Sequence, residues 1–210
     1  MREKLADADL IVSSYNNGEA IVQILSFLSQ GSVTPQKVHI ADDGSSKNSL
    51  DLIKNKLLRF AIPVDLHWQE DRGFRKARAL NSAIRACESK YVVFLDGDCL
   101  PHKHFVRDHL AMAEKGYFVQ GRRCFVRENQ VVPLLEGKTS LLRLMLSGKV
   151  SGLLKSIRLP KPIVRTNKDM YGLLGCNLGA WRGDLLAVNG FDEDYEGWGR
   201  EDSDLGARLY

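Results

Sequence analysis

Short apolar runs alternate with amphipathic segments of helical length along the N-terminal half of the chain, and this alternation constrains the fold more than any other feature. Four runs are predicted to be strands: residues 9–12, 38–41, 64–69 and 91–95. Three segments between them have the length and periodicity of helices: 19–30, 49–60 and 75–89. The pattern predicts an α/β fold, a Rossmann-like and mainly parallel sheet flanked by helices, with right-handed crossovers.

Acidic residues follow two of the predicted strands where each strand ends. Asp42 and Asp43 come after the second strand, and Asp96 and Asp98 come after the run Tyr91–Leu95. Because the carboxyl ends of parallel strands meet at one edge of a sheet, and ligands bind there, these acids are expected to border one pocket. An unpaired buried carboxylate is costly, so a cation or hydrogen-bond donors should face them.

Less regular patterns predict further elements. Residues 116–127 have the composition of strands, and residues 171–191 are predicted to be a strand followed by a short helix. In the first helix, the periodicity predicts an apolar face made of Ala20, Ile24, Phe27 and Leu28.

Bulk properties argue against several classes of protein. A net charge of +4 is too small to indicate nucleic-acid binding by itself. No stretch approaches the ~18 apolar residues of a membrane span. The four cysteines are scattered without zinc-knuckle or redox spacing, which is typical of a reducing, cytoplasmic setting.

Six motifs occur in one order along the chain: VSSYN (12–16), ADDGSS (41–46), QEDRGFRKARALN (69–81), FLDGDC (94–99), GCNLGAWRGDLLAVNGFDE (175–193) and GWGREDSDL (197–205). Together they resemble the family 2 glycosyltransferases of the GT-A fold, and the last two resemble the acceptor region of the animal galactosyltransferases. The resemblance implies an inverting transfer from a nucleotide-diphosphate sugar, with a divalent metal as cofactor.

The resemblance implies a donor site in the N-terminal half. Its residues would be Ser13, Tyr15, Asp42, Asp43, Arg75, Arg78 and Asp96. Asp42 or Asp43 would contact the nucleoside, with Asp43 favoured, and the arginines would face the diphosphate, with Asn81 one turn further on. Asp98 would bind Mn²⁺ or Mg²⁺, and Asp96 would be a second ligand or a nucleotide contact. A third metal ligand is expected beyond Tyr210, in a C-terminal part that the sequence predicts to be missing.

The matched tail implies the acceptor side. Asp202 would be the catalytic base that takes the proton of the acceptor hydroxyl. Glu201, Trp198 and Asn177 would contact the acceptor, and the Trp181–Arg182 pair lies in the same matched block.

Structural explanations remain open for most of these residues. An Asp-Gly turn, an Asx turn or a helix N-terminus would also use the acids, and a solvated helix face would also carry the arginines. His39 and His67 fall in predicted strands, where we expect structural roles.

The chain is predicted to be one GT-A domain. Residues 1–100 would bind the nucleotide sugar and residues 101–210 the acceptor, with a basic insert at about 125–168. Residues 137–168 contain eight basic residues and no acidic residue. Such a segment could be a solvated helical excursion or could contact the anionic inner face of the membrane.

The sequence therefore predicts a metal-dependent glycosyltransferase. Its donor would be a nucleotide sugar, in the first place a UDP-sugar, and its acceptor a carbohydrate or lipid-linked glycan in bacterial polysaccharide or lipopolysaccharide biosynthesis. A catalytically inactive sugar- or nucleotide-binding protein of the same fold, or a nucleotidyltransferase, is the alternative.

Overall fold

The computed structural model describes residues 7–152, 158, 173–195, 197 and 199–210. The chain forms two compact units. The first combines Met1–Gln120 with Asn167–Tyr210, and the second is Gly121–Thr166, which overlaps the predicted basic insert.

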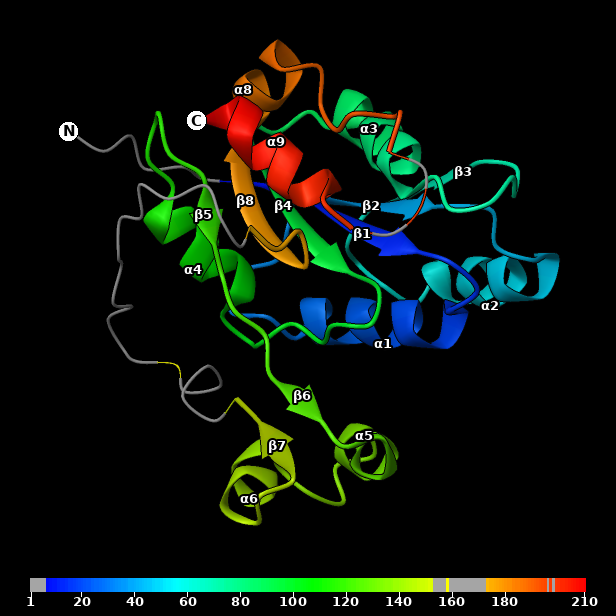
Figure 1. Ribbon diagram of the computed structural model, residues 1–210. Coiled ribbons are helices and arrows are strands. Elements are labelled where there is room, and N and C mark those ends of the chain that lie inside the picture. The colour runs from blue at the N-terminus through cyan, green and yellow to red at the C-terminus, as the bar shows by residue number, and fades with distance from the viewer. Residues whose placement is uncertain (1–6, 153–157, 159–172, 196, 198) are drawn as a thin grey trace. The chain divides into compact units, whose positions relative to one another are not determined.

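A six-stranded sheet in the order β3-β2-β1-β4-β8-β5 organises the first unit (Figure 1). Its first four strands in sequence are β1 (Asp9–Ser14), β2 (Lys37–Asp42), β3 (Val64–Trp68) and β4 (Tyr91–Asp96). These four strands are mutually parallel, so their carboxyl ends share one edge. The predicted α/β fold with a mainly parallel sheet is confirmed.

The last two strands of the sheet run antiparallel to their neighbours. β8 (Asn177–Trp181) pairs with β4, and β5 (Val119–Gln120) pairs with β8. In the first pair, Leu95 lies opposite Asn177 and Tyr91 opposite Trp181. The start of β8 is therefore at the same edge of the sheet as the end of β4.

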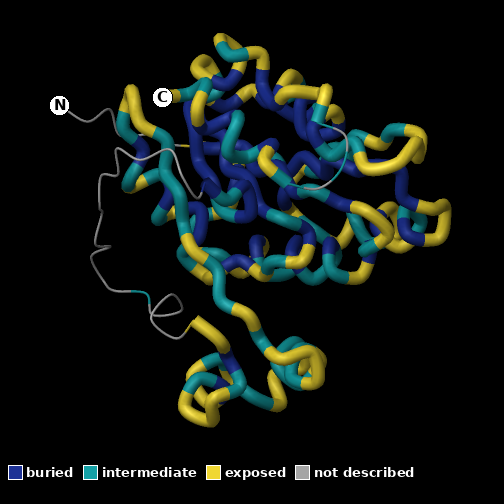
Figure 2. Tube along the Cα trace, viewed as in Figure 1, coloured by how far each residue is buried: buried dark blue, intermediate teal, exposed yellow. Residues whose placement is uncertain are grey.

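Helices cover both faces of the sheet because the strands are apolar on both sides. One core contains α1 (Gly18–Ser29), α2 (Lys47–Leu57) and α4 (Phe105–Met112). The other contains α3 (Lys76–Ala86), α8 (Arg182–Ala187) and α9 (Glu201–Leu209). Figure 2 shows the buried residues concentrated in the strands and on the inner faces of these helices.

The apolar face of α1 is rotated from the predicted one. Its buried core residues include Ile21, Ile24, Leu25 and Leu28. Ala20 and Phe27 are half-buried. The largely apolar run AIVQILSFL (20–28) fits several adjacent helical faces. Periodicity therefore located the helix but placed its core face one residue away.

The second unit has its own elements. Its strands β6 (Phe125–Val126) and β7 (Val150–Ser151) form an antiparallel pair, and its described helices are α5 (Glu128–Leu135) and α6 (Leu141–Leu146). The predicted strand material at 116–127 therefore forms β5 in one sheet and β6 in another. Within the described residues, no helix is both long and apolar enough to cross a membrane.

Gly97 is required where β4 ends, because a Cβ there would overlap the backbone carbonyl oxygen of Ser13. We expect Gly97→Ala to destabilise the protein by about 3 kcal/mol, since a backbone atom cannot yield as a side chain can. Gly183→Ala is the matched control, because nothing lies within 4 Å of its Cβ position. The difference in urea unfolding midpoints measures the effect, and equal midpoints for the two variants would contradict it.

Candidate active site

Asp96 ends β4 and joins three segments at the carboxyl edge of the sheet. Ser13 Oγ, from β1, donates a hydrogen bond to Asp96 Oδ1 over 3.2 Å. Lys76 Nζ, from the first residue of α3, lies 2.7 Å from the same oxygen, and both side chains of this ion pair are largely buried. A half-buried carboxylate thus receives its positive partner from the start of α3, the helix that precedes β4 in the chain.

Lys76 is the central residue that the sequence reasoning missed. Burial alone would lower the pKa of its ammonium group, but the negative charge of Asp96, together with Asp202 and Glu201, outweighs burial and raises it. One cation therefore interacts with acids from both the predicted donor side and the predicted acceptor side. Lys76 is part of the basic string RKAR (75–78). The predicted phosphate contacts were the two arginines of this string, Arg75 and Arg78, which are three residues apart.

Asp43 is held at the end of β2 by the segment that leads into α3. Its Oδ2 accepts a hydrogen bond from the backbone N–H of Arg75 over 2.7 Å, and its Oδ1 accepts from Gln69 Nε2 over 2.5 Å. Burial raises the pKa of Asp43, although these hydrogen bonds oppose the change. Asp43 is thereby bound to the backbone of Arg75, the residue that directly precedes Lys76.

Asp42 points into a different environment. Its side chain is fully buried, and its two oxygens accept hydrogen bonds from the backbone N–H and the hydroxyl of Ser45 over 2.7 and 2.6 Å. This is an Asx-type turn, in which the carboxylate satisfies backbone donors of the chain itself. Of the two acids, the geometry favours Asp43 for contact with a ligand.

Tyr15 lies on the outer rim near Asp43. The side chain is 54% exposed, and its hydroxyl donates to Asp71 Oδ2 over 3.1 Å. That hydrogen bond raises the pKa of Tyr15. An exposed ring tethered at one end leaves its face open to a flat ligand such as a base.

The two predicted phosphate-facing arginines differ. The Arg75 guanidinium donates from Nη2 to the Glu70 carbonyl oxygen, and its buried Nε has no hydrogen-bond partner. The side chain of Arg78 is exposed, and its guanidinium group makes no hydrogen bond or ion pair within the described part of the chain. Asn81 has a structural role, since it exchanges hydrogen bonds with the backbone of Phe191 over 2.7 and 2.8 Å.

Asp202 is brought to the same edge by the start of β8. Its Oδ2 accepts a hydrogen bond from the Gly175 N–H over 2.8 Å, two residues before the strand residue that lies opposite Leu95. A Cβ on Gly175 would overlap Asp202 Oδ1, so the glycine makes this approach possible. Asp202 Oδ1 is buried and has no hydrogen-bond partner.

The environment of Asp202 favours a proton on its carboxyl group more than water would. Burial, the largest influence, raises its pKa, and the charges of Glu201 and Asp96 act in the same direction. The Gly175 hydrogen bond and the positive charge of Lys76 lower it. Raised pKa values of this kind are typical of general bases and acids.

Two other predicted acceptor residues, Glu201 and Asn177, already have hydrogen-bond partners within the protein. Glu201 is 5% exposed, and its Oε2 accepts a hydrogen bond from the Gly199 N–H over 3.0 Å. Asn177 Oδ1 lies 2.8 Å from Nε2 of His109, a buried histidine whose pKa burial lowers to about 4. Trp198 lies outside the described residues.

Arg200, between these segments, has a positive φ of 73°. This left-handed conformation favours glycine.

Asp98 is suitable as a ligand of a divalent metal ion. Its side chain is exposed beside Asp96, and its Oδ1 accepts a hydrogen bond from the Cys99 thiol over 3.3 Å. Two carboxylates from one turn suit a hard divalent cation that takes further ligands from phosphate and water. Within the described residues, no cluster of three ionisable ligands includes either acid.

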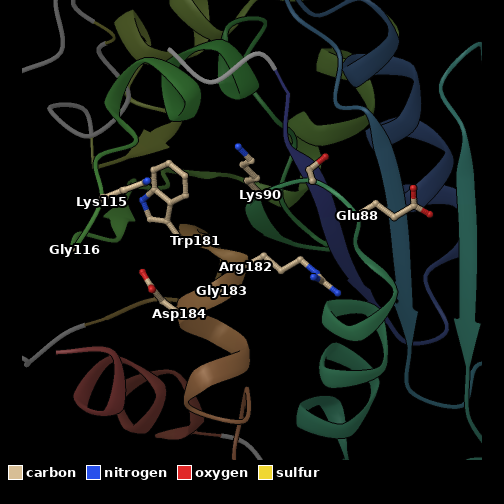
Figure 3. A pocket seen from close by; sticks show the side chains of 9 residues that line it. Glu88, Lys90, Lys115, Gly116, Trp181, Arg182, Gly183 and Asp184 are labelled. Carbon is tan, nitrogen blue, oxygen red and sulfur yellow. The ribbon is translucent and has the colours of Figure 1, made fainter. Parts of the chain in front are cut away.

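A cavity of about 430 Å³ lies at the opposite edge of the sheet, where β4 begins and β8 ends (Figure 3). Its lining includes Lys90, Lys115, Trp181 and Arg182. Trp181 and Arg182 therefore lie at the other edge of the sheet from Asp96 and Asp202. β8 is antiparallel to β4, so the far end of the matched strand points away from Asp96 and Asp202.

Comparisons with known proteins agree with this architecture. A family model described as "Glycosyl transferase family 2" matches residues 9–156, and one described as "N-terminal domain of galactosyltransferase" matches residues 162–210. A validoxylamine A glucosyltransferase of Streptomyces hygroscopicus subsp. limoneus is 26% identical over 96% of this chain and 47% of its own length. A chondroitin synthase of Escherichia coli is 22% identical over 96% of this chain and 32% of its own length. The chain thus spans about half or less of the length of these curated relatives.

Solved structures share the fold. The first 349 residues of S. aureus TarS, in complex with UDP-GlcNAc, superpose with a TM-score of 0.65 at 18% identity, covering 97% of this chain and 53% of that one. The mannosyltransferase PcManGT from Pyrobaculum calidifontis, in complex with GDP-Man and Mn²⁺, gives a TM-score of 0.62 at 18% identity, covering 100% and 54%. These likenesses confirm the predicted GT-A fold. Since the first family model covers residues 9–156 of the 210, this protein belongs to glycosyl transferase family 2.

Proposed function

We propose that this protein transfers a sugar from a nucleotide-diphosphate sugar, in the first place a UDP-sugar, to a hydroxyl of a carbohydrate acceptor, with inversion at the anomeric carbon. The observation that carries the proposal is the buried, unpartnered oxygen of Asp202 beside Lys76 and the Asp96 turn. A carboxyl group of raised pKa thus lies at the edge that also presents the acids of β2 and β4, which supports a role for Asp202 as the base.

In the proposed reaction Asp202 acts as general base. It takes the proton of the acceptor hydroxyl while that oxygen forms a bond to the anomeric carbon and the bond to the nucleoside diphosphate breaks. Gly175 fixes the carboxylate through its N–H, so the free Oδ1 is the oxygen available to the acceptor. Glu201, in the same helical turn, would contact the acceptor sugar.

The donor would lie along the strand ends. Asp43 would accept hydrogen bonds from the nucleoside, and the ring of Tyr15 would pack on its base. Asp98 with Asp96 would hold Mn²⁺ or Mg²⁺, which neutralises charge on the departing diphosphate when bound. Arg75, with its unpartnered Nε, would contact the phosphates.

The relatives support the substrate class. Their printed names are those of a glucosyltransferase, chondroitin synthases and a poly-beta-1,6-N-acetyl-D-glucosamine synthase. Structures of the same fold contain UDP, UDP-GlcNAc and GDP-Man. We infer a role in bacterial polysaccharide biosynthesis with a glycan acceptor.

Release of nucleotide from a panel of UDP-, GDP- and TDP-sugars, with Mn²⁺ and oligosaccharide acceptors, tests the function. Calorimetric titration with UDP and Mn²⁺ tests the donor site independently of the acceptor. We expect UDP to bind in a Mn²⁺-dependent manner. Absence of both binding and nucleotide release across the panel would overturn the proposal.

Lys76 is expected to set the pH range of the reaction. Because its charge lowers the pKa of Asp202, Lys76→Met should raise that pKa further. A base works when deprotonated, so the acid limb of the pH profile of kcat/KM should move to higher pH. Lys76→Arg should restore the profile, and Lys54→Met on the exposed face of α2 is the control. An unchanged acid limb in Lys76→Met would contradict the interaction.

We also propose that the protein works in the cytoplasm, at the inner face of the membrane, where it would meet a lipid-linked acceptor. The basic run 137–168 supports this, as do Leu142 and Leu146, which α6 exposes by 64% and 83%. Cations near an anionic surface contribute about 1 kcal/mol each. We expect sedimentation with phosphatidylserine vesicles at low salt, loss at 0.5 M salt, and weaker binding for Leu142→Ser/Leu146→Ser. Binding that salt does not change would argue against it.

A further inference from the structure

Two histidines that the active site does not use lie together on the edge of the sheet. His39 of β2 and His67 of the edge strand β3 have ring centroids 5.2 Å apart, and His39 Nδ1 lies 3.0 Å from His67 Nε2. Asp65 is opposite His39, and His67 is opposite Ala41, which packs in the core formed with α3. His39, Asp65 and His67 therefore lie on the face of the sheet that α3 covers. The two histidines therefore connect the neighbouring strands β2 and β3.

Asp65 completes a group of three ligands. One ligand atom from each of His39, Asp65 and His67 lies within 4.8 Å of the others. His39 is buried and His67 is half-buried, whereas the Asp65 side chain is 48% exposed, so the group opens to solvent on one side. Two imidazoles and a carboxylate with one accessible position are the donor set of catalytic-type zinc sites.

Asp9 lies behind His39, on the Nε2 side of its ring. The His39 Nε2 atom is 3.8 Å from Asp9 Oδ2, and Asp9 is itself fixed by hydrogen bonds from Glu88 and Ser89. Burial would raise the pKa of Asp9, but His39 and these hydrogen bonds outweigh it and lower the pKa to about 2. With this carboxylate on the Nε2 side, Nδ1 is the His39 nitrogen that faces His67.

A second, fully buried group shares His39 but is less suitable. It consists of Asp9, His39 and Cys87. Burial raises the pKa of the Cys87 thiol to about 12, so the thiolate that a metal needs is disfavoured. Its members are also closed to solvent, which leaves the Nδ1 side of His39 as the accessible one.

We propose that His39, Asp65 and His67 form a binding site for a divalent transition metal of the zinc class, with Asp9 as the group that orients His39. Zinc prefers such nitrogen and oxygen ligands, whereas the carboxylate pair Asp96 and Asp98 suits Mn²⁺ or Mg²⁺. Lys37, 3.2 Å from Asp65, would give way to the metal and keep its second partner Glu88 at 3.9 Å. The metal would cross-link the edge strand to β2.

Titration of the metal-free 210-residue chain with Co²⁺ and Zn²⁺ tests the site. We expect one equivalent of Co²⁺ with the visible absorption of a low-coordinate site, its displacement by Zn²⁺, and a Zn²⁺-dependent rise in Tm. His67→Ala and Asp65→Asn should each weaken binding by more than about 100-fold, because loss of an outer-shell partner alone costs about 10–100-fold.

Two control variants locate the binding. His104→Ala alters the other close histidine pair of the chain, in which His102 and His104 have ring centroids 5.4 Å apart, and should bind Zn²⁺ normally. Asp98→Asn should also bind Zn²⁺ normally while losing Mn²⁺-dependent UDP binding. The zinc site is therefore tested independently of the glycosyltransferase proposal. No stoichiometric binding by the intact chain, or unchanged binding in His67→Ala, would overturn the inference.

Discussion

Asp202→Asn is expected to lower kcat by about 10²–10⁴-fold, the range that a positioned general base supplies. The amide is nearly isosteric and can still accept the hydrogen bond from Gly175, but it cannot take a proton from the acceptor. The binding of UDP with Mn²⁺ should therefore persist. Single-turnover kinetics with a saturating donor measure the chemical step directly.

Asp194→Asn is the matched control for this variant. Asp194 is an exposed acid eight positions earlier in the same tail, and it should retain the rate of the unaltered protein. In the unaltered protein, activity should fall as pH drops through the raised pKa of Asp202, so the acid limb should lie above the range of an ordinary aspartate. If the kcat of Asp202→Asn lies within about threefold of that of the control, Asp202 is not the general base.

Asp98→Asn is expected to abolish Mn²⁺-dependent UDP binding and to lower turnover by about 10³-fold. A bound metal supplies several kcal/mol of charge stabilisation to the departing diphosphate, and ~4 kcal/mol corresponds to this factor. Because Asp98 is exposed, the substitution should leave the unfolding midpoint unchanged. Calorimetry at fixed Mn²⁺ and the urea unfolding curve separate the two effects.

Asp51→Asn controls for the loss of a surface carboxylate. Asp51 pairs with Lys47 on α2, where exposed ion pairs contribute little to stability. It should leave UDP affinity and turnover unchanged. Equal UDP affinity in Asp98→Asn and Asp51→Asn would mean that the metal is held elsewhere.

Local pattern was enough to predict the four parallel strands of the first unit and the helices between them. The strands predicted at 9–12, 38–41, 64–69 and 91–95 lie within or largely within β1 to β4. Side-chain period and strand length are properties of neighbouring residues, so they can be read from the sequence. The same reasoning put Asp43 and Asp96 at one edge, because parallel strands must share it.

The partner of each site residue could not be predicted in this way. Lys76 meets Asp96 across 20 positions of sequence, and Asn81 meets Phe191 across 110. Such contacts depend on how α3 is rotated on the sheet and where β8 is inserted. The neighbouring acids Asp42 and Asp43 look alike in sequence, and only the turn geometry separates the one bound to Ser45 from the one bound to Arg75.

The sequence by itself determined the alternating architecture, the family and the edge of the sheet that carries the acids. The tertiary structure decided that a lysine joins the donor-side and acceptor-side acids, that Asp202 keeps one oxygen free, and that Trp181 lies at the far edge. The physical reason is the distance along the sequence over which each kind of interaction acts. Periodicity and turn chemistry act over a few residues, whereas burial and charge act between segments that the sheet brings together.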